Sequence, residues 1–299
     1  MAIEGGPSQA TARMSDGTLL RTLHWEPAVG PWAVALVVHG LGEHAGRYGN
    51  VAAAFVPAGI DLHAYDHRGF GGSAGRRSYV DRWSQLHDDL QERLIAIRAA
   101  RPDLPLVLYG HSLGGLVACG YVLSDEPRPE PDLLVLSSPA LDSTLPAWKR
   151  AMAASLTRLV PRMRVSNGAI RDGLSHDPSI REAYVNDPLC QTSSTVRFGA
   201  EGFGEQERLR AALAARDAMP MPTYVFHGGG DPIVPVTASE VLATKGNVTR
   251  RVHEGLRHET HHEPEHEQVL SEVVAWIRGA IEALGTAAPS AAAEPVSIG

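Results

Sequence analysis

Cysteine is scarce in this chain: only Cys119 and Cys190 occur among 299 residues, which excludes a disulfide framework and any Cys-x-x-Cys metal site. No apolar run reaches the ~18 residues that a transmembrane helix needs. Basic side chains are in the minority, with 27 against 34 acidic ones. The formal net charge of −7 argues against general binding of nucleic acids, whose phosphates require neutralisation.

The first residues also lack a basic patch followed by an apolar stretch, so we expect no secretory signal and a cytoplasmic location, peripheral to a membrane at most. What the sequence does have is the composition of a globular protein, with 43% apolar and 20% charged residues. Its length corresponds to one large domain or two small ones.

Short apolar runs alternate with segments of helical periodicity through most of the chain. This alternation predicts an α/β fold with a mostly parallel central sheet flanked by helices, because parallel neighbours need crossover connections. The predicted strands are residues 33–38, 62–66, 106–109, 133–138, 223–227 and 248–255.

The alternation stops after the strand that ends near Ser138 and returns at about residue 218. We therefore expect a core of residues 10–141 and 218–284, with residues 142–217 inserted as a helical cap. An insertion at this point lies over the carboxyl ends of the strands, where open α/β sheets bind ligands. The two ends of the chain, residues 1–9 and 285–299, are expected to be disordered tails.

The segment LVLYGHSLGGLVA places the pattern Gly-x-Ser-x-Gly, residues 110–114, between a predicted strand and a predicted helix. Glycines permit a sharp, strained turn that lifts the Ser112 hydroxyl to the top of the sheet. The helix that follows directs its free amides toward developing negative charge. Ser112 is therefore the candidate nucleophile; the alternative is a purely structural turn.

A serine hydroxyl needs a base, and the base needs a third group to orient it. In this architecture an acid and then a histidine should follow the serine along the chain, each at a strand end. Asp231 follows strand 223–227, and His258 lies in the loop after the last strand. We predict a catalytic triad of Ser112, Asp231 and His258, which requires no metal or organic cofactor.

Acyl transfer also creates an oxyanion, which needs two converging hydrogen-bond donors. The amide of Leu113, directly after the nucleophile, is one predicted donor. The amide of Leu41, in the loop HGLGEHAGRY after strand 33–38, is the other.

The segments HGLGEHAGRY, DHRGFGGSAG, GHSLGG, HGGGD and EGLRHE, in this order, resemble the α/β-hydrolase family of monoacylglycerol lipases and lysophospholipases, close kin of serine aminopeptidase-like hydrolases. The resemblance covers residues 17–281 and includes REAYVNDPLC, which is similar to a cap segment of monoacylglycerol lipases. It implies the α/β-hydrolase fold and the same triad and oxyanion amides. It also implies polar contacts to the glycerol end of a substrate from Glu43, Arg47, Tyr184 and His261, although Glu43 and Arg47 could instead pair with each other.

Residues 143–166 carry five basic and no acidic side chains, and apolar residues recur there at helical spacing. This pattern predicts a basic amphipathic helix that either packs its apolar face on the core or touches lipid. Transient contact with a membrane surface through residues 144–165 is thus one of two expected roles. The apolar positions are Trp148, Met152, Leu156, Leu159, Val160 and Met163.

These observations favour a serine hydrolase that cleaves monoacylglycerols to fatty acid and glycerol through an acyl-enzyme. A broader carboxylesterase, lysophospholipase or aminopeptidase could use the same triad, and a non-catalytic binding module could use the same scaffold. A distant alternative is a zinc metallopeptidase, because His258-Glu259-x-x-His262 spells a zinc signature. That signature requires a helix, whereas Gly255 and Pro264 flank this segment and predict a loop.

Overall fold

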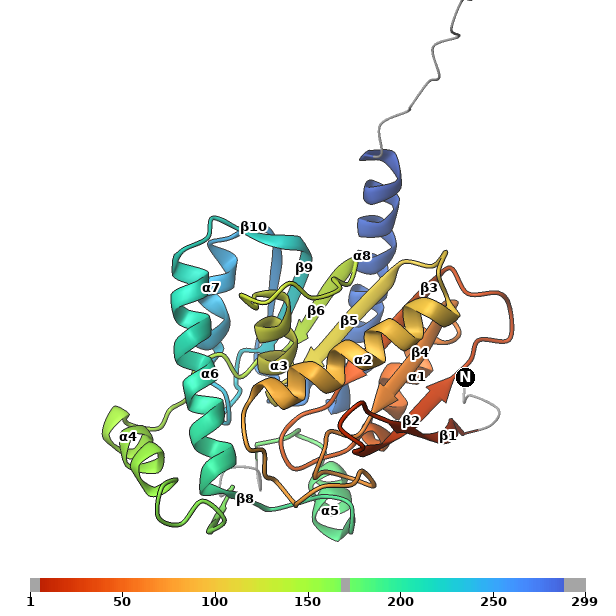
Figure 1. The fold of residues 1–299 in the computed structure, drawn as a ribbon. Helices are drawn as coiled ribbons and strands as arrows, with labels where there is room; N and C mark the ends of the chain where they lie inside the picture. The colour runs from red at the N-terminus through yellow and green to blue at the C-terminus, as the bar shows by residue number, and fades with distance from the viewer. Residues whose placement is uncertain (1–5, 168–172, 288–299) are drawn as a thin grey trace, which may run out of the picture.

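The computed structural model describes residues 6–167 and 173–287, built around an eight-stranded sheet (Figure 1). The strand order is β1-β2-β4-β3-β5-β6-β9-β10, and all neighbours from β4 to β10 are parallel, whereas β1 and β2 are antiparallel additions. The expected mostly parallel α/β sheet is thereby confirmed. The strands of this sheet are β1 (Ser8–Arg13), β2 (Leu19–Trp25), β3 (Ala33–Val38), β4 (Ile60–Tyr65), β5 (Leu106–His111), β6 (Leu133–Ser137), β9 (Ala218–Gly228) and β10 (Gly246–His253).

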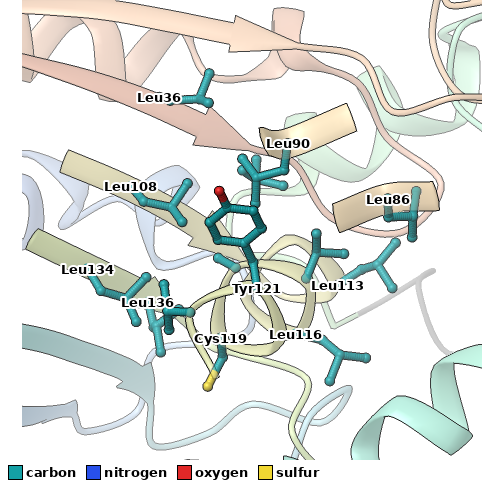
Figure 2. Close-up of a cluster of buried hydrophobic side chains, with 14 of the residues drawn as sticks. Leu36, Leu86, Leu90, Leu108, Leu113, Leu116, Cys119, Tyr121, Leu134 and Leu136 are labelled. Atoms are coloured by element: carbon teal, nitrogen blue, oxygen red, sulfur yellow. The ribbon is translucent and has the colours of Figure 1, made fainter. Parts of the chain in front are cut away.

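The central strands are mostly apolar because helices cover both faces of the sheet. Every residue of β3, AVALVV, is buried, and the same holds for β5 and β6. One face packs against α2 (Ser84–Ala100) and α3 (Leu113–Val122), and the other against α1 (Gly49–Phe55) and α8 (His266–Ala287). Figure 2 shows the first layer, where leucines of the strands point toward Tyr121 on α3 and Leu90 on α2.

The segment between β6 and β9 contributes elements that lie outside the eight-stranded sheet (Figure 1). Its elements are α4 (Ala147–Leu156), β7 (Arg164–Ser166), α5 (Pro178–Asn186), β8 (Ser193–Thr195) and α6 (Val196–Ala214). Strands β7 and β8 form a small antiparallel pair of their own. Helix α6 contacts both α4 and core helix α3.

The amphipathic helix predicted over residues 143–166 is shorter than expected. Helix α4 ends at Leu156, and residues 164–166 form β7 instead. Pro161 cannot continue a helix, because its ring removes the amide donor and clashes with the preceding turn.

The predicted tails need one correction. Ser8 and Gln9 pair with His24 and Leu23 as the first residues of β1, an exposed strand held by backbone hydrogen bonds rather than by an apolar pattern. At the other end, α8 continues through residue 287. The remaining tail residues, 1–5 and 288–299, and residues 168–172 of the expected cap lie outside the described residues.

The shorter helices η1 (Ala45–Arg47), η3 (Val236–Ser239), α7 (Glu240–Ala243) and η4 (Thr260–His262) lie in the connections between the larger elements. Among the described residues, no helix is both long and apolar enough to span a bilayer.

Candidate active site

Ser112 occupies the tight turn between β5 and α3 with a strained backbone, φ 53° and ψ −115°. Surrounding hydrogen bonds fix this conformation: its amide donates to Ser137 O at 2.9 Å, and its carbonyl accepts from Ala140 N at 3.0 Å. Glycine is required at position 114, because a Cβ there would overlap the carbonyl oxygen of Val38. The turn therefore presents the hydroxyl at the carboxyl edge of the sheet.

Asp231 and His258 meet at the same edge, as predicted from their places after β9 and β10. The ring Nδ1–H of His258 donates to Asp231 Oδ2 at 2.7 Å, with both side chains buried. The other carboxylate oxygen, Oδ1, accepts from the amides of Ile233 and Val234 at 2.8 and 3.0 Å. A carboxylate on Nδ1 leaves Nε2 as the nitrogen available to a nucleophile.

Ser112 and His258 line one cavity of about 590 Å³. Within the described residues no hydrogen bond joins the serine hydroxyl to the ring, which is common for catalytic pairs without substrate because these bonds tighten when it binds. The structure thus brings the predicted acid and base into direct contact and places the predicted nucleophile in the same chamber.

The charges around Asp231 and His258 favour an ionised acid and a neutral neighbouring ring, that of His111. Burial alone would raise the pKa of Asp231, but attraction to His258 and hydrogen bonds from His227 and His258 hold that pKa well below its ordinary value. Burial and the neighbouring His258 lower the pKa of His111 to about 4. Its ring centre lies 4.8 Å from that of His258, so His111 stays neutral beside the base at pH 7.

The loop proposed to supply an oxyanion amide passes directly beside the nucleophile. A Cβ on Gly40 would lie 3.3 Å from Ser112 Cβ, and the Gly40 amide donates to Glu43 Oε1 at 2.5 Å. Leu41 and Leu113 both line the cavity. Leu113 is also the first residue of α3, so its amide has no acceptor within the helix.

His39, at the end of β3, fixes the start of this loop. Its Nδ1–H donates to Gly40 O at 2.8 Å, and its Nε2 accepts from the amide of His67 at 2.9 Å. These two bonds require a neutral ring, and burial lowers the pKa of His39 accordingly. The loop is therefore braced before a substrate arrives.

The four residues expected to bind the polar end of a substrate do not all reach the cavity. Glu43 and Tyr184 line it, whereas Arg47 and His261 are not among its lining residues. Arg47 donates to Glu43 Oε2 at 2.6 Å and, through two nitrogens, to both oxygens of Glu259 at 2.6 and 2.7 Å. The pairing of Glu43 with Arg47 is thus realised.

His261 lies behind the cavity wall, fully buried and stacked on Tyr48 with ring centres 5.2 Å apart. Within the described residues neither of its ring nitrogens has a hydrogen-bond partner. The hydroxyl of Tyr184, in contrast, lies 3.0 Å from each of two acceptors, the carbonyls of Gly42 and Gln191. The Tyr184 hydroxyl therefore ties α5 to the loop after β3.

Two residues near the triad escaped sequence reasoning. Glu259 is the second carboxylate on Arg47, across 212 positions of sequence, and nothing local signals this contact. His227 donates from Nε2 toward Asp231 Oδ2 at 3.1 Å and toward Val234 O at 3.1 Å. Its place at the end of β9, four residues before the acid, was the available signal.

The geometry contradicts the zinc-peptidase alternative. Residues 260–262 form a single 3₁₀ turn rather than a helix. Nδ1 of His258 is engaged by Asp231, and both ring nitrogens of His262 face acceptors, Glu259 Oε2 and Arg47 O, at 2.8 Å. His262 therefore has no free ring nitrogen with which to share a metal with His258.

Two other clusters of the described residues have donor atoms close enough to share a metal ion: His24, Asp61 and His63, and His44, Asp187 and Cys190. In the first, Asp61 already accepts from His24 Nε2 at 2.5 Å and from Arg101 Nε at 2.8 Å. In the second, His44 Nε2 pairs with Asp187 at 2.8 Å. Neither cluster lies at the triad.

The model of a protein family described as serine aminopeptidase, S33, matches residues 30–265. A monoacylglycerol lipase of Mycolicibacterium smegmatis is 35% identical over 85% of this chain and 90% of its own length. A monoglyceride lipase of mouse, Mus musculus, is 31% identical over 92% of each chain. The crystal structure of Paleococcus ferrophilus monoacylglycerol lipase has a TM-score of 0.75 at 28% identity, covering 87% of this chain and 98% of that one.

Proposed function

The chain belongs to the serine aminopeptidase S33 family of α/β-hydrolases, and from this premise we propose that it hydrolyses monoacylglycerols to fatty acid and glycerol. The observation that carries the proposal is a largely apolar cavity lined by Ser112 and His258, together with buried polar groups such as Glu43. Such a cavity suits an ester with one long apolar arm and one small polar arm.

Ser112 Oγ attacks the ester carbonyl carbon while His258 Nε2 takes the hydroxyl proton. Asp231 keeps the Nδ1–H of His258 in place and stabilises the ring once it is charged. The amides of Leu41 and Leu113 bind the oxyanion. Collapse of the tetrahedral intermediate expels glycerol, which receives the proton from His258, and leaves the fatty acyl group on the serine.

Water then enters, loses a proton to His258 and attacks the acyl carbonyl, and a second collapse releases the fatty acid and restores Ser112. We assign the polar end of the substrate to Glu43 and Tyr184, which line the cavity. Arg47 and His261 contribute from behind them, Arg47 by holding the carboxylate of Glu43.

The charges of the cavity support an ester substrate over an aminoacyl substrate. An aminopeptidase needs a carboxylate free to receive the substrate's ammonium group. Among the described residues, the acids that line the cavity all have arginine partners: Glu43 and Glu259 pair with Arg47, and Asp142 lies 3.6 and 3.4 Å from Arg150 and Arg210. A broader carboxylesterase or lysophospholipase remains compatible with this arrangement.

The test is the Ser112→Ala variant. We expect it to lose monoacylglycerol hydrolysis by about 10⁶-fold in kcat, the scale seen when a triad serine is removed, because no other group can form the acyl-enzyme. Its circular dichroism spectrum and melting temperature should match those of the parent. Retained turnover contradicts the assignment, and faster turnover of lysophospholipids or aminoacyl amides by the parent contradicts the substrate class.

We also propose transient contact with a membrane surface through an arm of the protein formed by residues 144–165. Apolar side chains are exposed on this arm, with Trp148 at 63% and Leu159 at 80%, beside Lys149 and other basic residues. The same arm borders the cavity through Met152 and other residues, so lipid bound outside would lie near the cavity wall.

Co-sedimentation with vesicles containing anionic lipid tests this contact. Trp148→Ser combined with Leu159→Ser should reduce the bound fraction several-fold, because the change removes the two most exposed apolar side chains of the arm. Val185→Ser is the matched control, since Val185 is 55% exposed but lies on α5. Equal binding of both variants contradicts a role for this arm.

A further inference from the structure

Helix α6 forms one wall of the catalytic cavity with a single face. The lining residues recur at spacings of three and four, which places them along one side of the helix. They are Phe198, Gly199, Gly202, Phe203 and Gln206.

Neither Gly199 nor Gly202 is required by the backbone or by close packing. Both lie in the interior of an α-helix, outside the left-handed region where glycine is favoured. A Cβ at Gly199 would meet nothing within 4 Å, and one at Gly202 would lie 3.5 Å from Trp83 Cζ3, an ordinary contact. Since glycine weakens a helix relative to alanine, these two positions reduce stability with no local compensation.

What the missing side chains provide is room inside the cavity. Apolar side chains of two other helices line the same cavity: Leu113 and Leu116 of α3, and Met152 and Leu156 of α4. Ser112 and His258 line the same cavity, so an acyl chain attached at Ser112 can follow these apolar surfaces. A side chain at position 199 would occupy part of the same volume.

We propose that Gly199 and Gly202 determine which acyl chains the enzyme accepts, by keeping the α6 wall of the acyl channel wide enough for long chains. This rests on the proposed function, because it takes the cavity to be the acyl site of an ester hydrolase. The acyl chain is common to all esters of one fatty acid, so the inference can be tested apart from the glycerol group.

The experiment measures kcat/KM for the parent and three variants on two series of esters, monoacylglycerols and p-nitrophenyl esters, from short to long acyl chains. Gly199→Leu fills the open space, and Gly202→Ala adds the one methyl group that Trp83 leaves room for. Gly204→Leu is the matched control: it lies on the same helix, with nothing within 4 Å of its Cβ, but is exposed and outside the cavity lining.

We expect Gly199→Leu to move the preferred chain to shorter lengths in both series. Long-chain esters should lose about fourfold in kcat/KM for each methylene displaced, the equivalent of ~0.8 kcal/mol per buried methylene, while short-chain esters keep their rates. Gly202→Ala should cause a smaller shift in the same direction, and Gly204→Leu none. Gly202→Ala should also raise the melting temperature, by roughly 2 °C, because it removes a helix-weakening residue.

The inference is overturned if Gly199→Leu and Gly204→Leu give the same chain-length profile, or if long chains are still hydrolysed at the parental rate. If p-nitrophenyl esters show the expected shift but no monoacylglycerol is hydrolysed, the proposed function fails and the role of the glycines stands. A parent that hydrolyses neither series overturns both.

Discussion

At the scale of single residues, each acid of the site is held by several donors, most of them close to it along the chain. Glu43 accepts from the amide of Gly40, the hydroxyl of Tyr48 and the guanidinium of Arg47. Asp231 accepts from two amides and two imidazoles. Buried carboxylates are tolerated only when such donors replace water, and the same donors fix the position of every oxygen.

His227 is the donor whose contribution to catalysis can be separated from its contribution to the fold. It is fully buried, with Nε2 toward Asp231 and Nδ1 at 3.1 Å from Ser239 Oγ. We expect His227→Phe to lower kcat roughly tenfold, the equivalent of one hydrogen bond to a charged group. A carboxylate with one donor fewer attracts the proton on His258 more strongly. The acidic limb of the kcat/KM–pH profile should therefore move to higher pH.

Ser239→Ala is the control for this prediction, because it removes the partner of the other ring nitrogen without touching Asp231. It should lower the melting temperature and leave the acidic limb in place. If both variants shift the limb equally, His227 acts only through the packing of its loop.

At the scale of elements, the joint between α3 and α6 connects the cap to the core. Arg208 on α6 donates to the carbonyls of Gly120 and Leu123 at the end of α3, at 2.9 and 2.8 Å. It also holds both oxygens of Glu205, at 2.7 and 2.9 Å. Gly120 leaves room for this ion pair, because a Cβ there would overlap Glu205 Oε1. The ion pair thus both caps α3 and sets the distance between the two helices.

Removing one partner of this pair should cost more than removing both charges. Glu205 is 5% exposed, and burial raises its pKa, so its carboxylate is unfavourable without Arg208. We expect Arg208→Leu to lower the free energy of unfolding by about 3 kcal/mol, and the double variant with Glu205→Leu to be less destabilised. Urea unfolding of the parent, both single variants and the double variant measures this. Strict additivity of the two single effects would contradict the coupling.

The sequence predicts those elements whose burial produces a run of apolar residues along the chain. Strands β3, β5 and β6 are fully buried and mostly apolar, so they stand out in the sequence. Parallel strands place their carboxyl ends at one edge of a sheet. Topology alone therefore predicts that Ser112, Asp231 and His258 lie close together. Strand β1 is almost wholly exposed and carries no such pattern, so it was missed. The contact of Arg47 with Glu259 has no local signature either, because it joins loops at opposite ends of the chain.

At the scale of the whole molecule, the cap is attached unevenly. Its second half is bonded to the core: Gln191 Nε2 donates to Gly69 O at 2.9 Å, and Thr195 Oγ1 donates to Ser78 O at 2.6 Å. The backbone of the His258 loop is also tied to it, since the amide of Glu259 donates to Leu174 O at 2.8 Å. The first half is different, because α4 packs mainly on α6 (Figure 1). Helix α4, which lines the cavity, is therefore held to the core mainly through α6.

Neutral histidines buried throughout the core determine how the whole fold responds to acid. Burial lowers the pKa of each ring, to about 3 for His87 and to about 4 for His111. The pKa values of His39, His67 and His261 are lowered for the same reason. An unfolded chain takes up protons at these rings near pH 6.5, whereas the folded chain does not until much lower pH. Each ring thus removes stability as the pH falls from about 6.5 toward its folded pKa. The set comprises His39, His67, His87, His111 and His261.

Each ring contributes at most about 1.4 kcal/mol per pH unit to this loss, so five together can exhaust a typical stability of 5–15 kcal/mol within a few pH units. Two buried acids oppose it, since burial raises the pKa of Asp89 to about 6 and that of Glu205 in the same direction, and their protonation favours the folded state. The histidines outnumber them, so we expect the free energy of unfolding, measured with urea at a series of pH values, to fall steeply between about pH 6 and 4.

His87→Gln isolates one ring from this sum. The free energy of unfolding of this variant should fall less steeply with decreasing pH than that of the parent, by up to ~1.4 kcal/mol per pH unit. The reason is that one proton fewer separates the folded and unfolded states. Tyr121→Phe is the control: its ring packs against His87, and burial raises its pKa to about 12, so the hydroxyl does not titrate in acid. It should change the stability at every pH by the same amount. A parental slope near zero, or a His87→Gln slope equal to the parent's, would mean that these rings take up protons in the folded state and that the core admits their charge.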